Sequence, residues 1–368
     1  MISLSIGLNL LPVFLITLST TFGGVAGLSQ EQLGRLGAIS FAGVVLGILI
    51  TGPLADRWGA KPFVQLGNAL IGLSLTAMAF APGYPSLCLA LFFLGLGGGV
   101  LDMVLSPVVS ALNPTRRTPA LNMLHSFYCV GAALTILAGT LTLHAGFGWR
   151  TACLILLPLP VALLFAFGPQ HFPAMATTGG RTQARTLLSR GWFLGALAAI
   201  ALGGATELGL AQWLPAYAET VLGFPAWVGG SALLLFSLAM AAGRMVIGAV
   251  SMKLDSFQIM AWSCGLSVLL FMVGSFSPLP SVALAACIAA GFTGSCLWPT
   301  MLAITADRFP AGGASMFGLL AAFGNAGGIC MPWIVGWVAD HHNLHWGIAV
   351  SAIAPAGMMF LILALRRR

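Results

Sequence analysis

The sequence predicts an all-α polytopic membrane protein with twelve transmembrane helices in two pseudo-symmetric six-helix bundles. Hydrophobic residues make up 59% of the 368 residues and charged residues only 6%, whereas an ordinary soluble domain carries about 25% charged residues. The apolar stretches are long and continuous, without the alternation that a membrane β-barrel requires. The net charge of +7 comes from basic residues in short breaks between these stretches. This pattern excludes a soluble enzyme, a disordered chain and a nucleic-acid binder.

Each apolar stretch is long enough for one helical span, because about 20 residues cross the bilayer core. The first stretch is too long for the core of a signal peptide and lacks a basic start, so we expect it to be the first helix. The predicted spans are 4–27, 33–54, 61–80, 84–110, 119–143, 148–168, 190–217, 226–250, 256–276, 280–305, 313–337 and 346–365.

A polar segment divides the predicted spans into two sets of six. Residues 169–189 contain Pro, Gly, Thr and Arg and almost no long apolar run. We therefore expect an N-terminal bundle over 1–168, a cytoplasmic linker over 169–189 and a C-terminal bundle over 190–368. The remaining loops are too short for a soluble catalytic domain, and the sequence has no phosphate-binding G-x-x-x-x-G-K-[ST] loop. We expect no enzyme activity, no cofactor, no metal site and no nucleic-acid partner.

The basic residues predict the orientation of the helices. With an even number of spans both termini lie on one side, and thirteen of the fifteen Lys and Arg residues fall on that side; Arg35 and Arg150 fall opposite. The positive-inside rule makes the basic side cytoplasmic. The short loops suggest a bacterial inner membrane, and we expect a monomer without an obligatory protein partner.

The loop after the second span carries a recognisable motif. It contains Gly52, Asp56, Arg57, Gly59 and Lys61 in the order G-x-x-x-D-R-x-G-x-K. This loop resembles the cytoplasmic gate motif of the major facilitator superfamily, and the second half repeats part of it.

The echo in the second half begins at Gly243-Arg244 and continues through Gly248, Lys253 and Asp255. The resemblance implies two six-helix bundles with a substrate site between them, and it implies that Arg244 and the loop residues act at the cytoplasmic gate. The alternative is a loop that only fixes the topology.

Several further stretches, in order and at matching helices, look like the fucose–glucose–galactose proton symporter branch of that superfamily. That resemblance implies transport of a monosaccharide together with a proton. The stretches are Gly97–Asp102 with Ser106-Pro107, Ala120–Ala132, Glu207–Tyr217, Trp298–Thr300 and Gly324–Gly328.

Two acidic residues, Asp102 and Glu207, lie deep inside predicted spans. An ionised carboxylate at the bilayer centre is costly, so such a group tends to bind a proton. We expect Asp102 to carry the coupling proton, with Glu207 as a second proton site or a partner of substrate hydroxyls. His125 could pair with Asp102, bind a hydroxyl or serve only as a hydrogen-bonded packing group. The alternative for Asp102 is an acid that stays protonated between helices.

The substrate is expected to meet polar and aromatic residues in four spans. The span over 190–217 contains Gly203-Gly204 and Pro215, which predict an irregular helix lining a cavity. Trp213 and Tyr217 have an alternative role as interfacial belt residues. The candidate substrate-binding residues are Asn122, Phe127, Glu207, Gln212, Trp213, Tyr217, Trp298 and Asn325.

The charge inventory favours an uncharged solute. We find no basic residue near a span centre, because Arg244 is expected at the cytoplasmic rim, and an anionic substrate would therefore lack a partner charge. The sequence thus predicts a secondary transporter that moves a neutral monosaccharide or polyol with a proton by alternating access. The alternative is import or export of another neutral or cationic small molecule, since Asp102 and Glu207 could pair with an amine.

Overall fold

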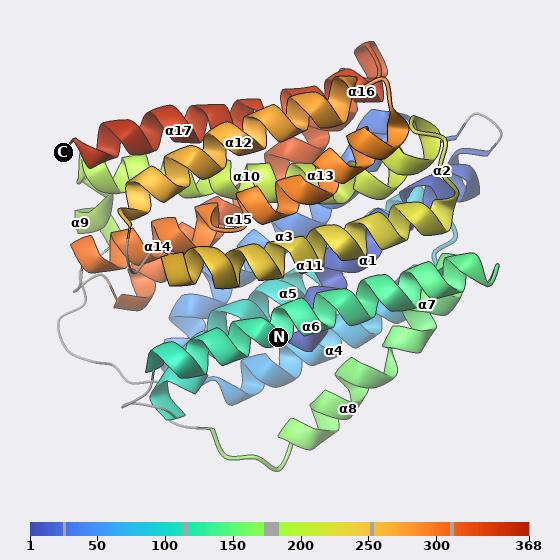
Figure 1. The fold of residues 1–368 in the computed structure, drawn as a ribbon. Coiled ribbons are helices and arrows are strands. Elements are labelled where there is room, and N and C mark those ends of the chain that lie inside the picture. The colour runs from blue at the N-terminus through green and yellow to red at the C-terminus, as the bar shows by residue number, and fades with distance from the viewer. Residues whose placement is uncertain (25–26, 113–116, 173–183, 251–253, 310–312, 368) are drawn as a thin grey trace.

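The computed structural model describes residues 1–24, 27–112, 117–172, 184–250, 254–309 and 313–367. Within these ranges the chain is helical and contains no strand (Figure 1). The helices are α1 (Ile2–Val13), α2 (Leu15–Gly23), α3 (Gln30–Trp58), α4 (Lys61–Ala79), α5 (Tyr84–Leu112), α6 (Arg117–His144), α7 (Gly148–Leu156), α8 (Pro158–Phe167), α9 (Ala184–Leu188), α10 (Gly191–Thr220), α11 (Ala226–Val250), α12 (Ser256–Phe276), α13 (Pro280–Gly294), α14 (Leu297–Arg308), α15 (Gly313–His341), α16 (Leu344–Val350) and α17 (Ile353–Arg366).

Every predicted span coincides with a helix or with two helices separated by a short break. In the part of the chain that the structure describes, ten segments are long and apolar enough to cross a membrane, and the pair α1–α2, bent by 65°, makes an eleventh. The fifth predicted span coincides with α6, of which the apolar part Val130–His144 is shorter. The all-helical membrane fold is therefore confirmed.

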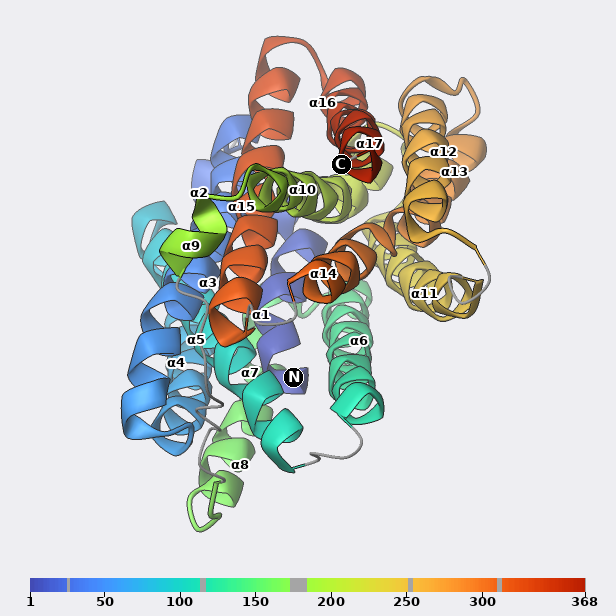
Figure 2. The ribbon, with the colours of Figure 1, turned by 90° about the vertical axis from the view of Figure 1, so that its left-hand side faces the viewer.

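The helices run side by side along one common direction, with the C-terminus at one end of the molecule and α2 and α16 towards the other (Figure 1). Figure 2 looks along this direction and separates α3–α8 from α10, α12, α13, α16 and α17. Two helix pairs join the halves of the chain: α3 packs on α15 and α6 packs on α11. Helix α1 also contacts α10, so the space between these helices is the place to look for a site.

The prediction of an irregular helix over 190–217 is wrong, because α10 is one continuous helix from Gly191 to Thr220 with Pro215 inside it. Gly203-Gly204 does not break the helix but lets α15 come close. A Cβ atom on Gly204 would lie 2.1 Å from the carbonyl oxygen of Gly324. The glycine pair therefore serves helix packing rather than bending.

Two other glycine-rich stretches also bring helices into close contact. A Cβ atom on Gly99 of α5 would lie 2.1 Å from the carbonyl oxygen of Val44 in α3. A Cβ atom on Gly327 of α15 would lie 2.3 Å from the carbonyl oxygen of Ala201 in α10. Any larger residue at Gly99 or Gly327 would push its pair of backbones apart.

Candidate functional site

A small pocket lies between the two halves of the chain. Its cavity volume is about 30 Å³, which is room for roughly one or two water molecules. Helices α1, α3 and α6 line it from the first half and α10 and α11 from the second. The residues that line this central pocket are Leu8, Asn9, Pro12, Phe41, Tyr128, Ala132, Glu207, Leu208, Ala211, Gln212, Leu233, Phe236, Ser237, Met240 and Arg244.

An ion pair occupies the second-half side of the central pocket. Nη2 of Arg244 lies 3.2 Å from Oε2 of Glu207 and 3.5 Å from Oε1. The Arg244 Nε also donates to the carbonyl oxygen of Ser295 at 3.4 Å, at the break between α13 and α14. Only 12% of the Glu207 side chain and 30% of the Arg244 side chain are exposed. The pair therefore holds one positive and one negative charge in a largely apolar site.

The position of the Arg244 guanidinium differs from the expected rim position. Arg244 lies two turns before the end of α11, which makes it a rim residue by sequence distance alone. Its long side chain reaches Glu207, near the middle of α10, instead of the helix end. Such a direction cannot be read from spacing, because a flexible side chain with a charged head can extend several ångströms along a helix. The central pocket thus contains the basic group that the sequence analysis did not expect.

Gln212 is the second polar group that α10 contributes. It is only 3% exposed, and its Nε2 atom has no hydrogen-bond partner. Gly37 of α3 makes room for it, since a Cβ atom there would lie 2.9 Å from the Gln212 amide carbon. Burying an unpartnered amide donor costs roughly 1–3 kcal/mol, so this donor is available to a ligand. Glu207 and Gln212 both line the pocket although they are about 140° apart around a helix, because the pocket covers more than one face of α10.

The first half contributes Asn9 and Tyr128, neither of which the sequence analysis selected. Asn9 Nδ2 donates to the carbonyl oxygen of Ser5 at 2.8 Å and to the Tyr128 hydroxyl at 3.4 Å. The sequence offered two signals for these residues: Asn9 is an amide within the apolar first span, and Tyr128 lies inside the Ala120–Ala132 stretch. Both halves therefore place hydrogen-bonding groups in the central pocket.

Trp213 and Tyr217 lie outside the central pocket and are fully buried packing residues. The Trp213 Nε1 donates to the carbonyl oxygen of Pro332 at 3.0 Å. The Tyr217 hydroxyl donates to the carbonyl oxygen of Gly274 at 2.8 Å and contacts the His345 ring nitrogen at 3.0 Å. Neither the substrate-binding role nor the interfacial role agrees with these positions, because both rings are 0% exposed.

Three further predicted substrate residues, Asn325, Trp298 and Phe127, do not line the central pocket either. Asn325 is buried in α15 and donates to the carbonyl oxygen of Ala321 at 3.0 Å. The Trp298 ring packs on Gly324, and Phe127 is 43% exposed. The side chains of Asn122 and His125 lie outside the described residues. Of the predicted residues whose side chains the structure describes, Glu207, Gln212 and Arg244 come together at the central pocket.

Asp102 lies on α5, half-buried within the first half of the chain. It does not line the central pocket. The amine of Met1 lies close enough to interact with it electrostatically. A coupling role for Asp102 would therefore have to act at a distance from the Glu207–Arg244 pair.

The predicted gate loop connects α3 to α4. Helix α3 ends at Trp58, and Gly59 follows with a φ of 78°, a conformation that favours glycine. Gly52 faces Met103 of α5, whose Cε would lie 3.2 Å from an added Cβ. Arg57 is exposed and Lys61 begins α4, while the side chain of Asp56 lies outside the described residues. The positive φ of Gly59 and the close approach of Met103 to Gly52 explain why these two positions are glycine. The gate role of the loop stays a prediction.

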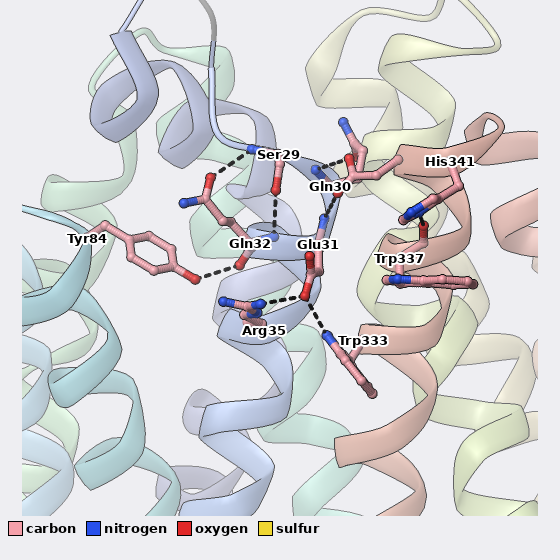
Figure 3. A network of polar contacts seen from close by, with 10 residues as sticks. Ser29, Gln30, Glu31, Gln32, Arg35, Tyr84, Trp333, Trp337 and His341 are labelled. Carbon is pink, nitrogen blue, oxygen red and sulfur yellow. Dashed lines mark hydrogen bonds and ion pairs between the residues drawn. The ribbon is translucent and has the colours of Figure 1, made fainter.

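At the opposite end of α3, a polar network joins the two halves (Figure 3). The Asp340 carboxylate at the end of α15 accepts hydrogen bonds from the backbone N–H groups of Gln30 (2.7 Å) and Glu31 (2.6 Å). Glu31 also accepts a bond from Trp333 Nε1 at 3.2 Å and pairs with Arg35. An anion at a helix N-terminus is favourable because of the unpaired N–H groups and the helix dipole. These bonds hold this end of the α3–α15 interface closed.

The described residues contain no group of three or more His, Cys, Asp or Glu side chains that could hold a metal ion. His345 of α16 packs edge-on against Tyr217, whereas His341 bonds to the carbonyl oxygen of Trp337.

Comparison with known proteins gives a family match over the whole chain. The model of the Major Facilitator Superfamily matches residues 1–280 and 230–368. The protein named "Probable nitrate/nitrite transporter NarK2" of Mycobacterium tuberculosis is 27% identical over 342 residues, covering 88% of this chain and 84% of the relative. The 3-(3-hydroxy-phenyl)propionate transporter of Escherichia coli is 28% identical over 371 residues, covering 94% and 88%.

Two solved structures have the same fold at low identity. A mutant form of the nucleoside transporter NupG has a TM-score of 0.80 at 13% identity and covers 99% of this chain and 98% of its own. A mutant form of the E. coli fucose:proton symporter FucP has a TM-score of 0.67 at 18% identity and covers 99% and 95%. These relatives are transporters rather than enzymes, and the fucose symporter is one of several neighbours rather than a distinguishing match.

Proposed function

The chain belongs to the major facilitator superfamily and is an integral membrane transporter, and we propose that it binds a small organic anion in the central pocket and moves it by alternating access. Alternating access means that the two halves rock about one site, which opens to each side in turn.

The observation that carries this proposal is the guanidinium of Arg244 inside the central pocket. Arg244 is the positively charged side chain among the described residues that line the pocket. The planar guanidinium has paired N–H donors that match the two oxygens of a carboxylate or nitrate. The unpartnered Gln212 amide adds a further donor on the same lining. A site with two such donors suits a ligand that offers oxygen acceptors.

The rest of the lining suits an apolar ring attached to the anionic group. Phe41, Phe236 and Tyr128 supply aromatic surface, and Leu8 and Leu233 supply aliphatic surface. Nitrate and 3-(3-hydroxyphenyl)propionate, after which the two relatives are named, are both anions, and the second carries an aromatic ring. These names support the same substrate class.

The cavity is too small for such a solute in this conformation, since its volume of about 30 Å³ has room for roughly one or two water molecules. Substrate loading therefore requires the halves to separate around the central pocket. The Asp340–Gln30 and Trp333–Glu31 bonds close the α3–α15 interface at one end. We infer that a substrate enters the central pocket only after the two halves have separated at one of the two ends of the molecule.

A second candidate is proton-coupled symport of a neutral monosaccharide. It is supported by the fold that the chain shares with the fucose:proton symporter and by Glu207, Gln212 and Asn9, which can bind hydroxyl groups. In this version Asp102, Glu207 or His125 carries the proton. The Glu207–Arg244 pair favours the anion, because a neutral sugar needs no fixed cation.

We further propose a monomer in a bacterial inner membrane, with the end opposite the Figure 3 network facing the cytoplasm. Arg57, Arg308 and Arg366 lie at that end, as the positive-inside rule requires.

The test is uptake by purified protein in lipid vesicles with a labelled panel of nitrate, 3-(3-hydroxyphenyl)propionate, L-fucose and a nucleoside. We expect saturable uptake of an anion by the wild type and a loss of at least about tenfold in Arg244→Gln, because a charge-assisted bond contributes about 1.5–3 kcal/mol. Arg185→Gln, which removes an exposed Arg on α9, is the matched control and should transport normally. Uptake of fucose alone, insensitive to Arg244→Gln, would support the second candidate instead.

A further inference from the structure

We propose that the central pocket takes organic acids that carry a hydroxyl group at the end remote from the carboxylate, and that the side-chain oxygen of Asn9 accepts the hydrogen bond from that hydroxyl. The inference rests on the proposed function, in which Arg244 receives the carboxylate, and deepens it by naming the substrate class. Its basis is the arrangement of Asn9 and Tyr128 on the first-half side of the pocket that Arg244 lines from the second half.

The nitrogen of the Asn9 carboxamide is already occupied. Nδ2 donates to the carbonyl oxygen of Ser5 at 2.8 Å and to the Tyr128 hydroxyl at 3.4 Å. These two bonds use both N–H groups of the amide. The amide oxygen, Oδ1, receives no hydrogen bond from the residues that the structure describes. Asn9 therefore brings a hydrogen-bond acceptor to the lining of the pocket.

Close packing of α1 on α6 explains why Asn9 is held in this place. A Cβ atom on Gly131 of α6 would lie 2.2 Å from Oγ of Ser5, so a larger residue there would push the two helices apart. Ser5 is one turn before Asn9 in α1, and its carbonyl oxygen accepts from the Asn9 amide. Helix α6 thus approaches α1 at the turn that anchors Asn9. The acceptor belongs to a packed part of the first half.

The polar groups on the second-half side of the pocket are mainly donors. Arg244 carries the N–H groups of its guanidinium, and Gln212 Nε2 is a buried donor without a partner. Glu207 accepts hydrogen bonds, but both its carboxylate oxygens already face Arg244. Donors suit the carboxylate of a substrate, whereas the Asn9 oxygen suits a hydroxyl group, which keeps its proton at neutral pH. A ligand that reaches across the pocket therefore meets donors in one half and an acceptor in the other.

The rest of the lining favours a carbon skeleton between these two groups. It is mostly apolar and includes Phe41, Phe236, Leu8 and Leu233. A ring or short chain that joins the hydroxyl to the carboxylate would bury its apolar surface there. Nitrate and unhydroxylated acids offer no donor to Asn9, and a site that holds an unpaired acceptor discriminates against a ligand without the matching group.

The experiment compares three acids with the same carbon skeleton: 3-phenylpropionate, 3-(3-hydroxyphenyl)propionate and 3-(4-hydroxyphenyl)propionate. Initial rates of labelled uptake into lipid vesicles give kcat/KM for each acid. We expect the wild type to prefer the better of the two hydroxylated acids over 3-phenylpropionate by about tenfold, the order of magnitude for one paired acceptor. Asn9→Leu should abolish this preference, because it removes the acceptor. Its residual uptake of 3-phenylpropionate reports that the variant folds.

Asn68→Leu is the matched control. Asn68 also donates to a carbonyl oxygen four residues earlier, that of Val64 at 2.9 Å, but it lies on α4 outside the pocket. The control should keep the preference of the wild type. Asn9→Ala is the second test variant, because it leaves space where Asn9→Leu adds an apolar group, and it should lose the preference as well.

The outcomes separate the inference from the proposed function. Equal transport of the hydroxylated and unsubstituted acids by the wild type would overturn the inference, and this result needs no variant. A preference that persists in either Asn9 variant would overturn it too. Both results leave the proposed function intact, since an organic anion is still transported. Failure of the wild type to take up any of the three acids would instead refute the proposed function, and the inference would fall with it.

Discussion

Gln212 shows how a single side chain can reveal a ligand site. A buried amide without a partner lowers the stability of the fold, and Gln212 Nε2 is such a group on the lining of the central pocket. Gly37 keeps the space beside it open. A side chain that weakens the fold in this way is expected where binding needs it, because functional sites are places where local rules are broken.

Replacing Gln212 by Leu should therefore separate stability from transport. Leu has a similar size and no unpaired donor, so we expect an unchanged or higher thermal unfolding temperature, with a gain of up to about 1 kcal/mol, and anion uptake lower by about tenfold. Detergent thermal unfolding and vesicle uptake measure the two effects. Asn68→Leu is the matched control, since Asn68 is also buried with an unpartnered oxygen but lies on α4, outside the pocket.

If Gln212→Leu and Asn68→Leu left uptake equally unchanged, Gln212 would be a packing residue and the pocket would have to bind its ligand through Arg244 alone.

At the level of helices, the sequence located every span but not the details of each one. Apolar length predicted where the helices lie, because the bilayer imposes that length on every span. The break between α13 and α14 leaves the Ser295 carbonyl oxygen to accept from Arg244. Pro299, four residues later, has no N–H to donate to that carbonyl, so a proline signal for the break was present within the 280–305 span. In contrast, Gly203-Gly204 and Pro215 suggested a break in α10 that packing against α15 overrides.

The α3–α15 interface carries a prediction at this scale. Asp340 caps α3 from the other half of the molecule, so losing its charge should weaken the closure of that end. A helix cap contributes about 0.5–2 kcal/mol, and 1 kcal/mol shifts a two-state equilibrium about fivefold. We expect Asp340→Asn to raise the population that is open at this end by about that factor. Pulsed electron paramagnetic resonance between spin labels at the exposed positions Pro82 and His342, with native cysteines replaced, measures it.

Asp255→Asn provides the comparison for that measurement. Asp255 also caps a helix, accepting from the Gln258 N–H at 3.0 Å, but α12 and its cap lie in the same half of the chain. Its loss should leave the distance distribution between the two labels unchanged. Equal broadening in both variants would mean that Asp340 supports the fold generally rather than the closure.

For the whole molecule, the sequence predicted the family fold well and the site only in part. Composition and the positions of apolar runs are distributed over hundreds of residues, so a few errors do not change the conclusion. The site depends on where individual side chains point. Glu207 and Gln212 were selected because polar residues within apolar spans are conspicuous, and both line the central pocket. Arg244 was assigned to the rim, and Trp213 and Tyr217 to the substrate, because the sequence does not give side-chain direction.

The two halves meet at the central pocket, and this arrangement makes the Glu207–Arg244 pair the centre of the account. Contacts at α3–α15 and α6–α11 surround a pocket to which both halves contribute polar groups. The pair belongs to the second half of the chain, and its guanidinium provides the recognition group that we propose for an anion.

The most direct measurement is equilibrium binding of labelled 3-(3-hydroxyphenyl)propionate to the purified protein, with wild type beside Arg244→Gln and Arg244→Lys. The account predicts saturable binding by the wild type, weakening of at least about tenfold in Arg244→Gln, and partial retention in Arg244→Lys, which keeps the charge but not the paired donors. Binding of equal strength by all three proteins would contradict the account, because the anion would then be held somewhere other than at Arg244.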